Sequence, residues 1–325
     1  MSDFRAIWDK VGGADVVHQM FSEHMVTSTV LTTLATGTSR KGLEIVRDVM
    51  ELKLYQRISK KMRPDLPELL EQVEREYAES PVKHNDTVWT LWLQGEDQAP
   101  EIVRVCFESL RQHLPDKRVV VLDAHSMRGV VDMPTHIVEK YEAGIISRTH
   151  FSDLLRLELM TSMGGTWVDS TVWLSGKPST FVTESDLFLF QNLKPGLDGK
   201  SISISSWLIT AQAPSRILLL TKDLLYRYWA RFDRMDDYFL LHYLMQLAIE
   251  TYPEEWSNVV PSSNSMPHVL LLRLGEPFNQ AVFDGVCRQT SIHKLTYKGL
   301  DQVDLKGTYL EHIIGAESGA GQNAH

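Results

Sequence analysis

The sequence predicts an α/β fold with a mostly parallel sheet, preceded by a helical region. Residues 1–80 contain good helix formers and no strand signals, whereas β-rich runs alternate with helical segments after residue 81. Such alternation is typical of parallel sheets that are covered by helices. Hydrophobic residues make up 43% of the 325 residues, so the chain can bury a substantial core.

The first 80 residues are expected to form a helical N-terminal region. Apolar residues recur at helical spacing through 41–62, and Pro64 ends that segment because proline cannot continue the backbone hydrogen bonding of a helix. A second helix is expected over 67–78. Ser80–Pro81 then marks the boundary to the next domain.

Residues 81–315 are expected to form one domain, followed by a disordered tail over 316–325. Folds in which strands and helices alternate bind ligands beyond the carboxyl ends of their strands. The functional residues are therefore sought at strand ends. The expected strands are 87–92, 118–123, 167–169, 186–190 and 203–209, and the expected helices are 100–113, 134–143, 152–163, 215–232 and 236–251.

Charge and cysteine content exclude several classes of function. The formal net charge of -9 argues against nonspecific binding of nucleic acid. Cys106 and Cys287 lack metal-ligand spacing, which excludes a cysteine zinc site and a disulfide scaffold. No secretory signal or long apolar span is visible, so a cytoplasmic protein is expected. The basic stretch 56–63 is either a solvated helix end or a docking surface for the inner face of a membrane.

The segment 152–171 brings carboxylates and a cation close to a predicted strand end. Ser152 is expected to cap a helix that stops at Gly164–Gly165, after which a strand delivers Asp169. Asp153 and Arg156 are three residues apart and share a helix face. Cations can bind a diphosphate, and a carboxylate can hold a metal that stabilises a leaving diphosphate. Taken singly, the pair also fits a surface ion pair, and the glycines fit a helix C-cap.

The same segment resembles a known family. Residues 150–156 and 164–172 resemble the core of the capsular polysaccharide synthesis protein family, which is similar to the wider group of DxD-containing sugar transferases with the GT-A fold. The resemblance implies a GT-A type nucleotide-sugar-binding domain, with a mostly parallel mixed sheet flanked by helices, behind the helical N-terminal region. Further matching segments are 89–95, 99–100, 237–243 and 293–298, so that the resemblance spans roughly residues 85–300.

The resemblance implies a glycosyltransferase of the hexosyltransferase type. Its donor would be a nucleoside diphosphate sugar, most often a UDP-sugar. Its acceptor would be a saccharide hydroxyl, free or lipid-linked, in the synthesis of capsular or other cell-surface polysaccharide, and the related transferases mostly retain anomeric configuration. Two alternatives stay open: a catalytically inactive nucleotide-sugar-binding protein, and a polysaccharide-assembly protein that acts through its N-terminal helices.

By the same resemblance, Asp153, Arg156 and Asp169 are the catalytic residues. Asp169 takes the first position of the DxD motif and, with Thr171 and His293, is expected to hold Mn²⁺ or Mg²⁺. Thr171 stands at the third motif position, where the wider group has a carboxylate, so metal dependence stays open. The donor is expected to contact Trp92, Gln94, Gly95, Asp153, Arg156, Gly164, Gly165 and Lys294.

Two further carboxylates open the expected helix 236–251. Asp236 and Asp237 either cap this helix, because carboxylates are favourable at a helix N-terminus, or bind and orient the acceptor. His242 on the same helix is expected to be a packed polar residue. The chain contains no nucleophile elbow, P-loop or dinucleotide-binding fingerprint.

Overall fold

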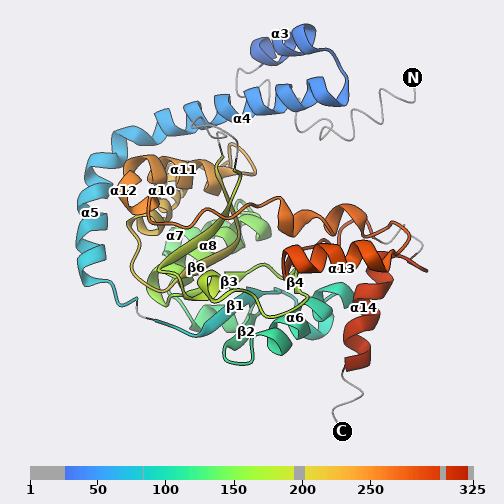
Figure 1. Cartoon of the computed structure of the whole chain (residues 1–325). Helices are drawn as coiled ribbons and strands as arrows, with labels where there is room; N and C mark the ends of the chain where they lie inside the picture. The colour runs from blue at the N-terminus through green and yellow to red at the C-terminus, as the bar shows by residue number, and fades with distance from the viewer. Residues whose placement is uncertain (1–25, 83, 194–201, 301–304, 321–325) are drawn as a thin grey trace.

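The computed structural model describes residues 26–82, 84–193, 202–300 and 305–320 (Figure 1). The predicted helical character of residues 1–25 and the predicted disorder of 321–325 lie outside these ranges. Helices cover a central five-stranded sheet, which confirms the α/β class. None of the helices in the described ranges combines the length and the apolar character that spanning a membrane requires.

The described chain begins with the helices α3 (Val26–Thr36), α4 (Arg40–Met62) and α5 (Leu66–Glu79). The Ser39 hydroxyl caps α4 by accepting a hydrogen bond from the backbone N–H of Gly42 at 3.1 Å. A 3₁₀ turn (η1, Arg63–Asp65) that contains a proline separates α4 from α5. The helices expected over 41–62 and 67–78 are therefore confirmed. Figure 1 shows α3 and the first half of α4 extending beyond the α/β body.

The second half of α4 and α5 belong to the main hydrophobic core. Ile58, Met62 and Val73 are fully buried and pack in the same cluster as α10 (Arg216–Arg231) and α11 (Leu240–Thr251). Burying such a side chain contributes about 1.5–3 kcal/mol. The core therefore extends across the predicted domain boundary at residue 80, although the chain does leave its helical region there.

The sheet has the strand order β2–β1–β3–β6–β5 and is mixed. The β1–β2 and β1–β3 pairs are parallel, whereas the β3–β6 and β5–β6 pairs are antiparallel, so parallel pairs are not the majority that the sequence predicted. The strands are Thr87–Leu91 (β1), Arg118–Leu122 (β2), Gly165–Val168 (β3), Leu187–Gln191 (β5) and Ile204–Ala211 (β6).

Successive side chains of β3 enter different hydrophobic clusters, because neighbouring residues of a strand point to opposite faces of the sheet. Trp167 packs in the cluster that contains α8 (Arg148–Ser162) and α10, whereas Val168 packs with α6 (Glu101–His113). The chain reverses between α8 and β3 at a glycine pair. The first turns of α8 therefore lie beside the carboxyl end of β3.

Three predicted boundaries are wrong. Ser147, not Ser152, caps α8, because its hydroxyl accepts a hydrogen bond from the His150 backbone N–H at 3.2 Å and the helix is continuous from Arg148. Helix α11 begins at Leu240 instead of residue 236. Residues 316–320, predicted to be disordered, continue α14 (Tyr309–Ala320).

The other described elements are η2 (Glu96–Gln98), η3 (Ser126–Gly129), α7 (Thr135–Glu142), α9 (Thr180–Glu184), α12 (Pro253–Trp256), η4 (Met266–His268), η5 (Leu271–Arg273) and α13 (Gln280–Gln289).

A second, two-stranded sheet joins the C-terminal part of the chain to the segment that follows β3. It pairs β4 (Val172–Leu174) antiparallel with β7 (Ile292–Lys294), and its register sets Val172 opposite Lys294 and Trp173 opposite His293. Trp173 is buried in a cluster with side chains of α6, α13 and α14. The segment that follows the β3 strand end is therefore held against residues more than a hundred positions later in the chain.

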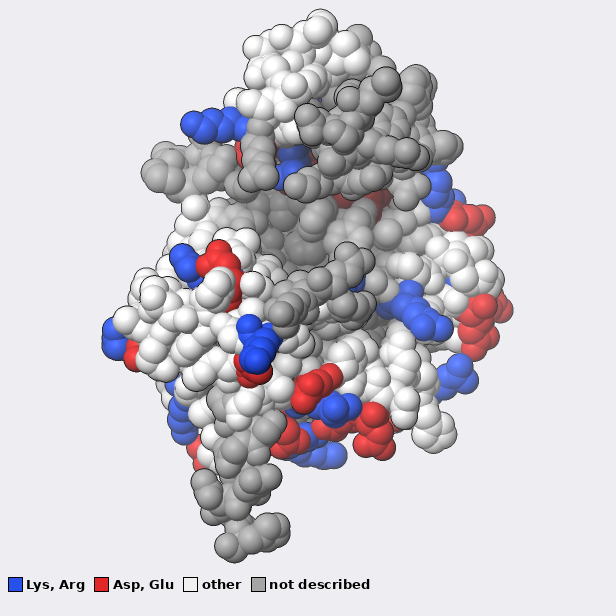
Figure 2. Space-filling view, turned by 90° about the vertical axis from the view of Figure 1, so that its right-hand side faces the viewer, with Lys and Arg blue, Asp and Glu red and all other residues white. Residues whose placement is uncertain are grey.

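The surface carries both signs of charge. On the face shown in Figure 2, Lys and Arg side chains are interspersed with Asp and Glu side chains. On this face, the mixed distribution differs from the concentrated basic surface that phosphate-backbone binding needs.

Candidate functional site

A cavity of about 510 Å³ opens at the carboxyl ends of β1 and β3. Its wall is built from the end of β1, the first turns of α8, the end of β3, one side chain of β6 and the start of α11. This is the end of the sheet at which α/β folds bind ligands. The lining residues are Leu91, Trp92, Leu93, Gln94, Arg148, Thr149, Ser152, Asp153, Arg156, Trp167, Asp169, Ser170, Ser206, Tyr238, His242 and Tyr297.

Arg156 lies at the centre of the polar groups in this cavity. One terminal nitrogen is 3.2 Å from Asp153 Oδ1 and 3.3 Å from Asp169 Oδ1. The other donates to the backbone oxygen and to the hydroxyl of Ser206, both at 2.7 Å. The guanidinium also lies 5.1 Å from the Trp167 ring centroid. The structure thus brings the three predicted catalytic residues together through two ion pairs.

The Asp153–Arg156 pair is buried, so the alternative of a surface ion pair is wrong. The side chains are 11% and 5% exposed. Burial disfavours the charged carboxylate, but Arg156 and a hydrogen bond from His150, 3.2 Å from Asp153 Oδ2, hold the pKa of Asp153 below its usual value. Asp153 is therefore a carboxylate at neutral pH, and both of its oxygens already have partners.

Asp169 follows β3 directly and is contacted by three donors. Trp167 Nε1 donates to Oδ1 at 3.1 Å, next to the Arg156 contact, and Lys294 Nζ is 3.5 Å from Oδ2. Lys294 also donates to the hydroxyl of Thr171. The backbone of this segment is fixed from both sides, because Asp169 N–H donates to Trp207 at 2.8 Å and Thr171 accepts from Leu295 N–H at 2.8 Å.

Comparison with known families matches residues 45–313 to the family described as "Capsular polysaccharide synthesis protein". The chain belongs to the capsular polysaccharide synthesis protein family. The matched range includes every residue of the cavity, and it confirms the family that the sequence resembles. Membership supports a glycosyltransferase-like function in capsular polysaccharide synthesis. A search of curated proteins finds no match.

Two solved structures that resemble this family member are glycosyltransferases. The first, the "PaToxG Glycosyltransferase", is 12% identical, with 61% of this chain and 79% of that chain covered and a TM-score of 0.38. The second is the apo form of the glycosyltransferase GlyE of Streptococcus pneumoniae TIGR4. It is 12% identical, with 73% of this chain and 60% of that chain covered and a TM-score of 0.37. At this similarity, neither structure assigns an activity to the capsular polysaccharide synthesis protein.

Gly164 and Gly165, predicted to contact the donor, do not line this cavity. Both lie at the amino end of β3, the end opposite Asp169. Gly164 accepts a hydrogen bond from Trp89 Nε1 at 3.0 Å, and a side chain at Gly165 would approach the Thr87 backbone oxygen to 2.4 Å. Gly165 therefore allows β3 to lie close to β1, and the φ of 69° at Gly164 favours glycine in the turn after α8. Of the loop after β1, Trp92 and Gln94 line the cavity as predicted, whereas Gly95 lies in the turn beyond, with a φ of 87°.

His293 does not join Asp169 and Thr171. Adjacent residues of a strand point in opposite directions, and Lys294 is the residue of β7 that faces the motif. The His293 side chain is fully buried, contacts Ser175 Oγ at 2.9 Å and lies against Trp173 with ring centroids 5.2 Å apart. Burial lowers its pKa to about 4. The structure therefore places the His293 side chain apart from Asp169 and Thr171, with which it was predicted to hold a metal.

Neither Asp236 nor Asp237 lines the cavity, so the prediction that they bind the acceptor is not supported. Asp236 is buried and forms an ion pair with Lys61 of α4. Asp237 Oδ1 accepts from the Phe239 N–H at 2.7 Å, in the turn that precedes α11. Both carboxylates therefore stabilise the structure around the start of this helix.

Several cavity residues were missed or given another role by the sequence. His242, expected to be a packed polar residue, lines the cavity, and burial lowers its pKa to about 4. Within the described residues, its Nδ1 has no hydrogen-bond partner. Tyr297 lies edge-on to Trp92 with ring centroids 5.3 Å apart. Arg148, Tyr238 and Ser206 also line the cavity without having been predicted. The segment 237–243, which resembles the family, contains both Tyr238 and His242 and is the sequence signal that could have indicated them.

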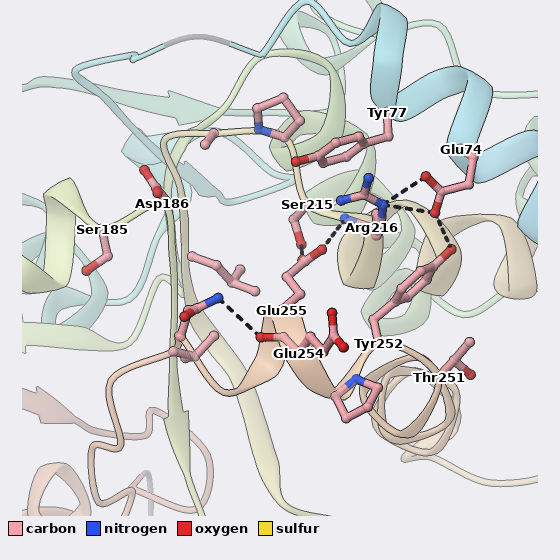
Figure 3. A pocket seen from close by; sticks show the side chains of 16 residues that line it. Glu74, Tyr77, Ser185, Asp186, Ser215, Arg216, Thr251, Tyr252, Glu254 and Glu255 are labelled. Atoms are coloured by element: carbon pink, nitrogen blue, oxygen red, sulfur yellow. Dashed lines mark hydrogen bonds and ion pairs between the residues drawn. The ribbon is translucent and has the colours of Figure 1, made fainter.

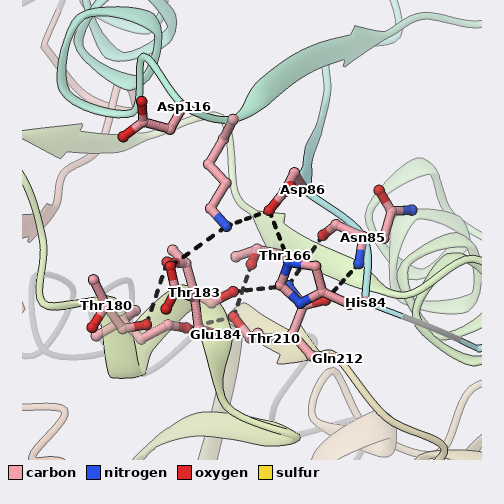
Figure 4. Close-up of polar contacts among 12 residues, drawn as sticks. His84, Asn85, Asp86, Asp116, Thr166, Thr180, Thr183, Glu184, Thr210 and Gln212 are labelled. Carbon is pink, nitrogen blue, oxygen red and sulfur yellow. Dashed lines mark hydrogen bonds and ion pairs between the residues drawn. The ribbon is translucent and has the colours of Figure 1, made fainter.

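Two other cavities lie at the opposite end of the sheet. One, of about 810 Å³, lies between α5, the start of β5 and the start of α10, and several of its polar side chains bond to each other (Figure 3). Arg216 pairs with Glu74 at 2.9 Å, and Glu255 accepts from Ser215 at 2.6 Å. A smaller cavity of about 360 Å³ lies beside the polar contacts of Figure 4, where Lys117 pairs with Asp86 at 2.6 Å. Neither contains a residue of the motif, so the 510 Å³ cavity is the candidate site.

Proposed function

We propose that this protein transfers a hexose from a nucleoside diphosphate sugar, in particular a UDP-sugar, to a saccharide hydroxyl during capsular polysaccharide synthesis. One observation carries the proposal: Asp153, Arg156 and Asp169 meet inside a cavity at the carboxyl end of the sheet. A buried polar network that is aimed into a cavity is the arrangement expected of a binding or catalytic site.

The charges of the cavity suit an anionic donor. Arg148 and Arg156 line it and Lys294 stands beside it, whereas its carboxylates are Asp153 and Asp169. The local charge is therefore positive although the whole chain has a net charge of -9. A diphosphate carries charge-assisted acceptors that such cations bind strongly. Arg156 can stabilise the negative charge that develops on the leaving diphosphate, and Asp153 and Asp169 hold its guanidinium in place.

Aromatic side chains in the cavity lining suit the base of the nucleotide. Trp92 and Tyr297 form an edge-to-face pair beside Gln94 at the end of β1. Aromatic faces stack on planar rings, and an amide can both donate to and accept from a base. The donor would then extend from these residues to Arg156, and the sugar would lie toward Tyr238 and His242.

The pairing of both carboxylates supports a retaining reaction. Asp153 and Asp169 are each contacted by cations, and the pKa of Asp153 lies below its usual value, so Asp153 is not a strong base and both carboxylates already have charged partners. In a retaining transfer the leaving diphosphate can accept the proton of the acceptor hydroxyl. Analysis of the product anomer by NMR spectroscopy tests this part of the proposal, and an inverted product would contradict it.

Replacing Asp169 with asparagine tests the proposed site. The wild-type protein is screened with UDP-, GDP-, ADP- and dTDP-hexoses in the presence of oligosaccharide acceptors, and we expect it to release nucleoside diphosphate from its donor. In Asp169→Asn this release should fall on the order of a hundredfold, because Arg156 and Lys294 lose their charged partner. Asp116→Asn, which changes an exposed aspartate that pairs with Lys177, is the matched control and should keep full activity. A fully active Asp169→Asn would refute the assignment.

A second candidate function is favoured by Thr171, which replaces the carboxylate expected at the third motif position. A protein that has lost catalysis would bind the nucleotide sugar without turning it over. Binding of a nucleotide sugar by the wild-type chain, together with no release of nucleoside diphosphate for any donor and acceptor pair, would establish this alternative.

A further inference from the structure

We infer that the ammonium group of Lys294 takes the place of a divalent metal ion in this site, so that the donor diphosphate binds without metal. The inference rests on the proposed function and specifies how the same site handles charge. In the wider group that the sequence resembles, the first and third motif positions hold the metal. Here these positions are Asp169 and Thr171, and the cation that contacts both is Lys294.

The position of Lys294 follows from the fold. The antiparallel register of β4 and β7 sets Lys294 opposite Val172, next to the motif. The Leu295 N–H donates to the Thr171 backbone oxygen at 2.8 Å, which fixes the neighbouring peptide as well. The Lys294 side chain is 19% exposed, so its ammonium group is largely removed from water. It is therefore a built-in cation of the site and not a flexible surface lysine.

The residues around Lys294 do not fit a divalent metal. Asp169 Oδ1 accepts from Trp167 and contacts Arg156, and Oδ2 contacts Lys294. Both oxygens of Asp153 are likewise engaged. Thr171 offers a neutral hydroxyl, a poor ligand beside the carboxylates that hard cations prefer. Over the described residues, no group of three or more His, Cys, Asp or Glu side chains could hold a metal ion.

Electrostatics also disfavours a metal at this place. A divalent ion in contact with Asp169 would stand next to two cations, Arg156 and Lys294, that approach different oxygens of the same carboxylate. Like charges at such short distances repel strongly in a partly buried site. A metal would therefore have to displace Lys294, whereas a diphosphate could use the ammonium as it stands.

Lys294 can serve the leaving group directly. An ammonium has three donors, and the contacts with Asp169 and Thr171 use two of them, which leaves one for a phosphate oxygen. When the bond between the anomeric carbon and the diphosphate breaks, its electron pair goes to the phosphate oxygen. The acceptor oxygen forms the new bond to the anomeric carbon, and its proton passes to the diphosphate. Lys294 and Arg156 balance the charge of the departing group.

Nucleotide titrations of the purified full chain test the inference. Binding of UDP, GDP, ADP and dTDP is measured by calorimetry, once with EDTA and once with MnCl₂. We expect the tightest ligand to bind with the same affinity in both buffers. Lys294→Met should weaken that binding about ten- to hundredfold, the loss expected for a hydrogen bond to a charged group. Lys177→Met removes an exposed lysine that pairs with Asp116 and should leave the affinity unchanged.

A double variant adds a test in which a new property, and not only a loss of binding, is expected. Thr171→Asp combined with Lys294→Ala supplies a second carboxylate and removes the competing cation, and we expect its nucleotide binding to require Mn²⁺. Circular dichroism of each variant confirms the fold. Wild-type binding that needs Mn²⁺ would overturn the inference and leave the proposed function standing. Absence of binding for all four nucleotides in both buffers would overturn the proposed function and the inference together.

Discussion

Replacing Gly165 with alanine tests whether the glycine pair is structural. The added Cβ would lie 2.4 Å from the Thr87 backbone oxygen and 3.2 Å from Trp89 Nε1. Thr87 belongs to β1, the direct neighbour of β3, so it cannot move without disturbing the pairing. Overpacking of this kind costs about 1–3 kcal/mol. The φ of 93° is left-handed, and a non-glycine residue there costs about 1–2 kcal/mol more.

We therefore expect Gly165→Ala to lower the free energy of unfolding by about 2–5 kcal/mol. At about 2 °C per kcal/mol, Tm should fall by about 4–10 °C in calorimetry. Gly95→Ala is the matched control, because Gly95 has a φ of 87° but no atom within 4 Å of the added Cβ. It should lose only the backbone contribution of about 1–2 kcal/mol. An unchanged Tm in Gly165→Ala, with weaker nucleotide binding, would refute this reasoning and restore the donor-binding assignment.

Two further predictions concern buried titratable groups. Burial raises the pKa of Asp223 to about 7, against the opposing effect of Lys222, whereas an unfolded aspartate titrates near about 3.9. The folded state therefore binds this proton more tightly, and the contribution to stability is lost as pH rises toward 7. The free energy of unfolding of the wild-type protein should decline by at most about 4 kcal/mol between pH 4 and 8 because of this group, and Asp223→Asn should remove the decline. Denaturant unfolding across this pH range measures it, and identical pH profiles for the variant and the wild type would contradict the prediction. His242→Phe removes the Nδ1 atom that has no partner among the described residues, and donor turnover should fall about three- to tenfold with little change in Tm. A large loss of stability would instead show that His242 is only a packing residue.

The sequence was sufficient to predict the part of the site that depends on local spacing. Asp153 and Arg156 share a helix face because they are three residues apart, and Asp169 lies at the functional end of the sheet because it directly follows a strand. The glycine pair has the same local pattern whether it binds a ligand or closes a turn. Because β3 runs between them, the pair lies at the amino end of the strand and Asp169 at its carboxyl end, and the order of the elements in the sequence already implies this separation.

Residues delivered by tertiary packing could not be predicted in this way. Ser206 reaches Arg156 because β6 runs antiparallel to β3, and the sequence predicted a mostly parallel sheet. His242 and Tyr238 reach the cavity through the packing of α11. The choice between His293 and Lys294 was available from the sequence, since neighbouring strand residues face opposite sides and only one of them can meet the motif.

The ion pair between Lys61 and Asp236 links the helical region to the cavity wall. Asp236 immediately precedes the turn and helix that supply Tyr238 and His242. A chain that began at β1 would leave Asp236 without this lysine and would uncover the core that Ile58 closes. The helices before residue 80 are thus not a separable linker, because they share a hydrophobic core with the α/β domain. Because α4 contacts α11 and α5 contacts α10, both helices belong to the packing that supports the start of α11.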